Sequence, residues 1–213
     1  MTWLQGGPFV EISFLLTLDT DRQALIEAVL TKLKSFSPTL EIAINEKEAK
    51  QKIEEFHNGY PYNEKNSKSI VYHATQIPIY MDIDGKRKST LAFEQVSSRL
   101  VEVDFWFFGS EWDAPEWNQK GITEDQIPYF KKVLHNLFDT FDFILGTLGY
   151  EVSTTDLFDT RDGWPSEKYN LDNIKSRAFH GDDYFLTIIA NKRHIDIADI
   201  DGVKTNGQKQ IIE

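Results

Sequence analysis

Cysteine is absent from this chain of 213 residues. Its absence excludes disulfide bonds, thiolate metal sites and a cysteine nucleophile, and it predicts a protein of the reducing cytoplasm. Long apolar runs are absent too, since no stretch reaches the roughly 18 apolar residues that a membrane-spanning helix needs. The first apolar run is interrupted by Glu11 and Ser13, which indicates a strand and not a signal peptide. We therefore expect a protein that does not cross a membrane.

Basic residues are scarce. The chain has 23 lysines and arginines against 34 aspartates and glutamates, which gives a formal net charge of -11. The most basic stretch, residues 86–88, has the pattern of a turn and not of a binding stripe. An acidic protein repels phosphate backbones, so nucleic-acid binding is not expected. The same charge attracts a basic protein partner or a cation.

Sequence motifs of common cofactor and catalytic sites are missing as well. The chain has no glycine-rich nucleotide loop, no HExxH zinc motif and no solenoid repeat, so no cofactor is predicted and a non-enzymatic protein is favoured. Two weak metal candidates remain. One is a group near the C-terminal end: His194, Asp196, Asp199 and Asp201. The other, residues 82–85, begins like a calcium loop but lacks the later ligands.

Two segments alternate between core and outward positions, as strands do. In residues 9–18 the even positions are apolar, whereas Glu11, Ser13 and Thr17 fall on the other face. In residues 100–108 the odd positions are apolar. Each of these strands precedes an amphipathic helical pattern, which suggests that the second half of the chain repeats the layout of the first.

Helical periodicity follows both strands. The first helix is expected after a capping box at Thr20 and Gln23, and a second, thinner helix after Asn45. The third is expected to begin near Asp125 with Pro128 in its first turn, and its apolar positions step by three and four residues as far as 148. Shorter strands are predicted at residues 70–74, 79–83, 89–93, 150–154 and 184–190, with Asp84-Gly85 as a hairpin turn.

These elements predict an α+β fold. The content of 40% hydrophobic and 13% aromatic residues is sufficient for a substantial core. We expect two β-α-β-type halves with a mostly antiparallel sheet and helices packed on one face, for which a duplicated ferredoxin-like layout is the first hypothesis. The chain is predicted to be a single domain, residues 1–213, or two intimately packed halves, residues 1–68 and 69–213.

The candidate site lies between residues 100 and 117, where acidic and aromatic side chains are concentrated. Alternation along the strand sends four of them to the face away from the core, and a neighbouring strand 9–18 would add Glu11 and Ser13 to it. The loop that follows is also acidic and aromatic. The predicted partner-binding residues are Glu102, Asp104, Trp106 and Phe108 on the strand, and Glu111, Trp112, Asp113, Glu116 and Trp117 in the loop.

Three interpretations of this surface are open. In the first, Trp112 or Trp117 simply covers the strand's aromatic side chains and leaves Glu102 and Asp104 in solvent. In the second, aromatic anchors and carboxylates bind a basic protein. In the third, Glu102 and Asp104 form a catalytic or metal site.

The second interpretation gives the leading functional hypothesis. It is a non-enzymatic cytoplasmic protein that binds another protein through an acidic and aromatic sheet face. Bacterial immunity proteins that neutralise basic toxins are a class with these gross properties, although fold and charge alone do not establish membership. The alternative is a small-ligand-binding protein or a metal-dependent hydrolytic enzyme that uses Glu102 and Asp104.

Overall fold

The computed structural model of this chain describes residues 9–61, 71–109, 121–157 and 184–194, together with the backbone of residues 209–212. The elements, in chain order, are β1 (Phe9–Thr17), α1 (Arg22–Leu33), β2 (Leu40–Ile42), α2 (Glu46–Asn58), β3 (Tyr60–Pro61), β4 (Val71–Tyr72), β5 (Ala74–Asp82), β6 (Lys86–Gln95), β7 (Leu100–Phe108), the 3-10 helix η2 (Glu124–Gln126), α3 (Ile127–Phe141), β8 (Leu145–Tyr150), the 3-10 helix η3 (Thr154–Leu157), β9 (Phe185–Asn191) and β10 (Lys209–Ile212).

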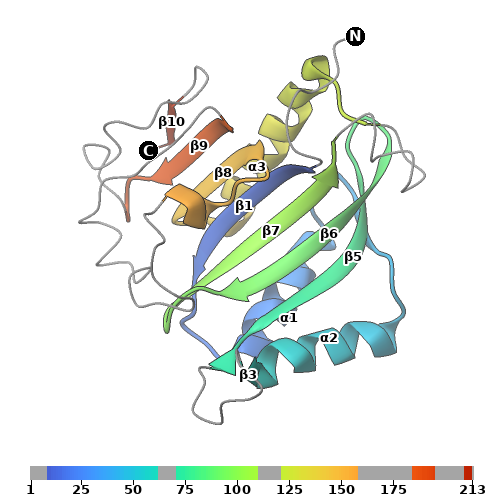
Figure 1. Ribbon diagram of the computed structural model, residues 1–213, viewed down its shortest axis with the longest axis vertical. Helices are drawn as coiled ribbons and strands as arrows, with labels where there is room; N and C mark the ends of the chain where they lie inside the picture. The colour runs from blue at the N-terminus through green and yellow to red at the C-terminus, as the bar shows by residue number, and fades with distance from the viewer. Residues whose placement is uncertain (1–8, 62–70, 110–120, 158–183, 195–208, 213) are drawn as a thin grey trace.

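Eight of the strands form one twisted sheet with the order β10-β9-β8-β1-β7-β6-β5-β2. Neighbouring strands are antiparallel except for the parallel pair of β9 and β10. Figure 1 looks onto one face of this sheet, and α1 and α3 lie behind it. The predicted α+β class, with a mostly antiparallel sheet and helices on one face, is therefore confirmed.

A duplicated ferredoxin-like arrangement is not confirmed. Strand β1, from the first half of the sequence, lies between β7 and β8 of the second half and pairs with both. Strands of the two halves are thus interleaved in one sheet. The two alternating segments that suggested a repeat, residues 9–18 and 100–108, are instead neighbouring antiparallel strands of the same sheet.

The helices begin where local side-chain hydrogen bonds favour it. Asp21 caps α1 by accepting hydrogen bonds from the backbone N–H groups of Gln23 and Ala24, so the predicted cap at Thr20 is wrong by one residue. An aspartate carboxylate directly before the first turn is a strong cap. The predicted capping box of α2, between Asn45 and Glu48, is present. Pro128 lies in the first turn of α3, where its missing N–H costs little.

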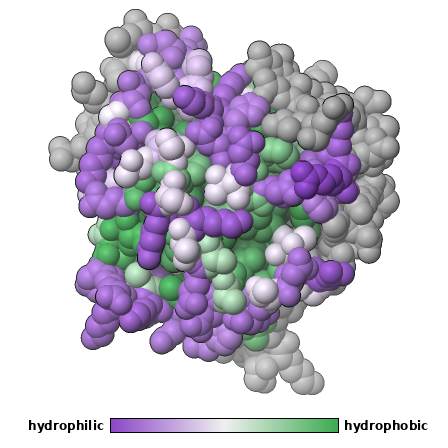
Figure 2. Space-filling view, turned by 180° about the vertical axis from the view of Figure 1, so that it is seen from behind, coloured by the Kyte–Doolittle hydropathy of each residue, from purple (hydrophilic) through white to green (hydrophobic). Residues whose placement is uncertain are grey.

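The main core lies between the sheet and the three helices. Buried side chains of β1, Val10, Ile12 and Phe14, and the odd positions 101–107 of β7 pack there against apolar residues of α1 and α3. Figure 2, which shows the molecule from behind, has hydrophilic side chains over much of this surface with hydrophobic ones between them. The alternation of β1 and β7 thus decides which of their side chains point away from the helices.

The predicted end of α3 is wrong. Apolar spacing extended the helix as far as 148, but α3 ends at Phe141, Asp142 adopts a left-handed conformation with φ 48°, and β8 follows at Leu145–Tyr150. The strand expected at 150–154 is therefore displaced toward the N-terminus. Strand β8, with the sequence LGTLGY, is buried on both faces and shows no alternation of polar and apolar side chains, so the spacing of its leucines cannot be distinguished from that of a buried helix.

The outer face of the sheet is the face opposite α1, α2 and α3. Part of it is covered by η3 and by a second apolar cluster that includes Leu15, Leu100, Leu157 and Phe185. Figure 1 shows η3 on the viewer's side of β8, whereas the described residues leave the ribbons of β7, β6 and β5 uncovered on that side. The candidate site lies on this outer face, at the border between the part that η3 covers and the part that the described residues leave open. It is formed by polar side chains.

Candidate functional site

The structure places Glu102, Asp104, Trp106 and Phe108 on the outer face, the face that strand alternation assigns to them. Antiparallel pairing sets Glu11 of β1 opposite Trp106 and Ser13 opposite Asp104, so the neighbouring-strand hypothesis is correct. The other five predicted site residues lie outside the described residues: Glu111, Trp112, Asp113, Glu116 and Trp117. The description of the site is therefore based on the side chains of the strands.

Four carboxyl groups meet on three adjacent strands, and we call them the carboxyl cluster: Glu11, Glu94, Glu102 and Asp104. On β6, Glu94 is directly opposite Glu102 of β7. Asp104 follows two residues after Glu102 on the same face, and Glu11 is diagonal to Asp104 across the β1–β7 pair. Opposite and diagonal positions of a sheet lie within reach of one another's side chains. Asp104 therefore occupies the middle of the cluster.

The cluster is buried and not solvated. Glu102 and Asp104 are only 2% and 3% exposed, and Glu11 is 9% exposed, whereas Glu94 is half-buried. The interpretation that left Glu102 and Asp104 in solvent is therefore wrong. Buried carboxyl groups are costly unless they are paired, hydrogen-bonded or protonated.

Glu102 is held by the start of η3. Its carboxyl group accepts hydrogen bonds from the hydroxyl group of Thr154, from the backbone N–H of Thr155 at 3.0 Å and from the Thr155 hydroxyl at 3.2 Å. The backbone N–H of Thr154 also donates to Ser13 Oγ at 2.6 Å, and Ser13 Oγ lies 2.9 Å from Thr147 Oγ1. This network fixes η3 on β1 and β7.

Asp104 differs from Glu102. Its Oδ1 atom is buried and accepts no hydrogen bond from any residue that the structure describes. Buried polar atoms are hydrogen-bonded in the great majority of cases, and exceptions call for an explanation such as a ligand or ion. An unsatisfied oxygen at the centre of a group of carboxyls is the most unusual feature of this face.

Two further carboxyl groups each accept a hydrogen bond from a neutral side chain. The indole Nε1 of Trp106 donates to Glu11 Oε1 at 3.0 Å, and the hydroxyl group of Tyr72 on β4 donates to Glu94 Oε1. The donors described for the cluster are thus indole, phenol, serine and threonine hydroxyl, and backbone groups. The ion pairs described in this structure lie elsewhere on exposed side chains, for example those of Lys86 with Glu41 and of Arg193 with Asp142.

Burial shifts the ionisation of the whole cluster. It raises the pKa of Glu94 and that of Glu11 from 4.5 to about 8, and the charge of Glu102 adds to both shifts. Burial also raises the pKa of Glu102, although its hydrogen bonds from η3 act in the opposite direction. The pKa of Asp104 lies well above its usual value because of burial and of the surrounding carboxyls. The cluster therefore retains protons at neutral pH.

Sequence analysis identified part of this site and missed the rest. Glu94 was missed because the strand predicted at 89–93 ends one residue before it, although its alternation with Thr90 and Ala92 on the outer side was visible. Thr154 and Thr155 were assigned to the start of an irregular segment, and no local pattern indicates that they meet Glu102. Tyr72 was recognised only as a strand residue.

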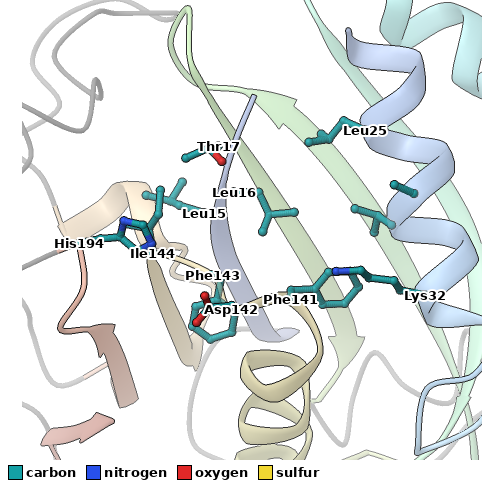
Figure 3. A pocket seen from close by; sticks show the side chains of 12 residues that line it. Leu15, Leu16, Thr17, Leu25, Lys32, Phe141, Asp142, Phe143, Ile144 and His194 are labelled. Atoms are coloured by element: carbon teal, nitrogen blue, oxygen red, sulfur yellow. The ribbon is translucent and has the colours of Figure 1, made fainter. Parts of the chain in front are cut away.

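A small cavity of about 170 Å³ lies away from the cluster, between α1, β1 and the end of α3 (Figure 3). Lys32 and Phe141 point toward each other there, and His194 lies near Ile144. The other members of the predicted His194 metal group, Asp196, Asp199 and Asp201, lie outside the described residues. Within the described part of the chain, no three histidine or acidic side chains are grouped so as to hold a metal ion.

Comparison of the chain with protein-family models, with curated proteins and with solved structures finds no match. None of the helices in the described ranges combines the length and the apolar character that crossing a membrane requires. Function must therefore be argued from the carboxyl cluster itself.

Proposed function

We propose that this protein is a non-enzymatic, cytoplasmic binding module that recognises a basic protein through the outer face of its sheet. The observation that carries the proposal is the buried carboxyl cluster, in which Asp104 Oδ1 accepts no hydrogen bond from the described residues. A positively charged side chain from a partner would supply the hydrogen bonds that this oxygen lacks. An immunity-type protein that neutralises a basic partner is one example of such a function.

Long-range charge supports the same conclusion. The net charge of -11 attracts a basic protein over a Debye length of about 10 Å and accelerates encounter. The rim of the cluster carries the half-buried side chains of Trp106, Tyr72 and Phe9. Aromatic side chains are enriched at the energetically dominant positions of protein interfaces. The outer face therefore offers both a charged centre and aromatic anchors.

The test is affinity capture with three baits: the wild-type chain, Asp104→Asn and Asp139→Asn. Asp139 is exposed on α3, on the other side of the sheet, so it controls for the loss of one carboxyl group. The proposal predicts a protein of net positive charge that is captured by wild type and by Asp139→Asn and is lost or strongly reduced with Asp104→Asn. Equal capture of all specific partners by the three baits would overturn it.

A second candidate function, acid-base chemistry on a small ligand, is favoured by one observation. Burial raises the pKa values of Glu11 and Glu94 to about 8, and carboxyl groups that hold a proton near neutral pH are typical of catalytic sites. A metal-dependent version predicts that Mg²⁺, Mn²⁺ or Zn²⁺ raises the melting temperature of wild type but not of Asp104→Asn. If none of these ions changes the melting temperature of wild type, the metal-dependent version is wrong.

A further inference from the structure

We propose that the carboxyl cluster is a receptor for a single arginine side chain, presented by the basic partner and seated between Asp104 and Trp106. This inference rests on the proposed function, because it names the chemical group that the outer face recognises. Such a receptor needs a hydrogen-bond acceptor at its base and a surface on which the planar cation can stack. Its geometry must also favour arginine over lysine and over a metal ion.

The acceptor is Asp104. Its side chain is 3% exposed, and its Oδ1 accepts no hydrogen bond from the described residues. Glu11 on β1 and Glu94 on β6 lie diagonally on either side of it, and Glu102 lies two residues along β7. A cation that approaches Asp104 is therefore surrounded by carboxyl oxygens from three strands.

Trp106 provides the surface. It lies two residues beyond Asp104 on the same strand face and is only half-buried. Its position is fixed by the hydrogen bond from Nε1 to Glu11 and by contact with Phe9, whose ring centroid lies 6.5 Å away. A guanidinium group stacks on an indole face while its N–H groups remain free to donate in the plane.

The geometry favours arginine over other cations. Adjacent strands lie about 4.8 Å apart, so acceptors on β1, β7 and β6 are spread over a width that a planar group with five donors can span. The compact ammonium group of lysine has three donors around one nitrogen and cannot reach acceptors on all three strands. A metal ion needs its ligands grouped around one point, and no such group of three exists among the residues that the structure describes.

The charged groups that raise the pKa values of Glu11, Glu94 and Asp104 are all acidic, whereas Lys88, on the same side of β6, lies further along the strand and diagonal to Trp106. Besides the four members, Asp156 of η3 and Glu151, between β8 and η3, raise the pKa of Glu11, and Tyr72 of β4 contacts Glu94 through its hydroxyl group. A bound guanidinium group stabilises the ionised carboxylates, so it displaces protons from the cluster. Below pH 8, arginine binding should therefore strengthen as pH rises, by about tenfold per pH unit for each proton released.

The experiment uses the full chain and three small probes: arginine amide, lysine amide and citrulline amide, which has the shape of arginine without its charge. Binding is followed by NMR through the indole N–H signal of Trp106 and the side-chain carboxyl signals of the cluster. The expected result is saturable binding of arginine amide, at least tenfold weaker binding of lysine amide and no saturable shift with citrulline amide. Equal binding of arginine and lysine amides, or no saturable shift at the cluster with arginine amide, would overturn the receptor.

Two variants and two controls complete the test. Asp104→Asn and Glu94→Gln should each weaken arginine amide binding by at least tenfold, whereas Asp139→Asn and Glu54→Gln, which remove exposed carboxyls on the helices, should leave it unchanged. The backbone amide spectrum of each variant verifies that it is folded. If both cluster variants bind arginine amide as wild type does, the receptor assignment is wrong.

Failure of this inference can be distinguished from failure of the proposed function. A basic partner whose capture depends on Asp104, combined with no arginine amide binding, would retain the binding module and overturn the arginine receptor. The reverse outcome is also informative. If arginine amide binds but capture of the partner does not depend on Asp104, the arginine receptor is retained and the proposed route of partner recognition is overturned.

Discussion

Replacing Glu94 with glutamine should change how stability depends on pH. In the folded protein burial raises the pKa of Glu94 from 4.5 to about 8, so the folded chain keeps a proton that the unfolded chain loses. Folding stability therefore falls as pH rises through the window between these two values and levels off above pH 8. Glutamine has no proton to lose, and its carbonyl group can still accept the hydrogen bond from Tyr72. Glu94→Gln should thus abolish this contribution.

The magnitude follows from the two pKa values. One pKa unit corresponds to about 1.4 kcal/mol, so a rise from 4.5 to about 8 corresponds to at most about 5 kcal/mol of unfolding free energy, lost between pH 4.5 and 8. The expected slope for this group is about 1.4 kcal/mol per pH unit in the middle of the window. Wild type and Glu94→Gln should have similar stability at pH 5, and the variant should be several kcal/mol more stable than wild type at pH 8.

Urea unfolding followed by tryptophan fluorescence at pH 5, 6, 7 and 8 measures this difference. Glu54→Gln is the matched control, because Glu54 is an exposed glutamate on α2 and its loss should leave the pH slope as in wild type. Parallel pH profiles of wild type and Glu94→Gln would refute the reasoning, as would a variant that is less stable than wild type at pH 8.

Three further substitutions test the packing that builds the site. Thr154→Val removes a hydroxyl donor to buried Glu102 and should destabilise the fold by about 1–3 kcal/mol, measured by urea unfolding. Gly146→Ala would place its Cβ 2.5 Å from the ring of Phe143, so thermal unfolding should show a loss of about 1–3 kcal/mol, and an unchanged melting temperature would contradict this contact. Phe14→Ala empties a fully buried position under the helices and should cost about 3–5 kcal/mol in the same assay, with a loss below 1 kcal/mol as the contrary result.

The fold was most predictable where polar and apolar side chains alternate along an element. The alternation of residues 9–18 and 100–108 predicted the correct strands and the correct outward side chains, because successive side chains of a strand point to opposite faces of the sheet, although the polar face of β7 proved to be buried as well. The same rule failed for β8, whose sequence LGTLGY has no alternation of polar and apolar side chains, and there the spacing of the leucines was mistaken for the end of α3.

The candidate site was predictable only in part, because its burial depends on contacts between distant residues. Sequence alternation could place Glu102 and Asp104 on the outer face, but Thr154, which covers Glu102, lies 52 residues away in the chain. Nothing local indicates that contact. Asp104 is buried and its Oδ1 accepts no hydrogen bond from the described residues. To predict this, the positions of side chains on three strands must be known together. Individual residues could thus be found from the sequence, whereas their ionisation could not.

Counting protons during binding tests the central claim most directly. Once the basic partner is captured, calorimetric titrations at pH 7 in two buffers of different ionisation enthalpy give the number of protons released when it binds. The account predicts the release of at least one proton by wild type and by Asp139→Asn, and a smaller release with weaker binding for Asp104→Asn. Binding without proton release by the wild-type protein would contradict the claim that a cation of the partner displaces protons from the carboxyl cluster.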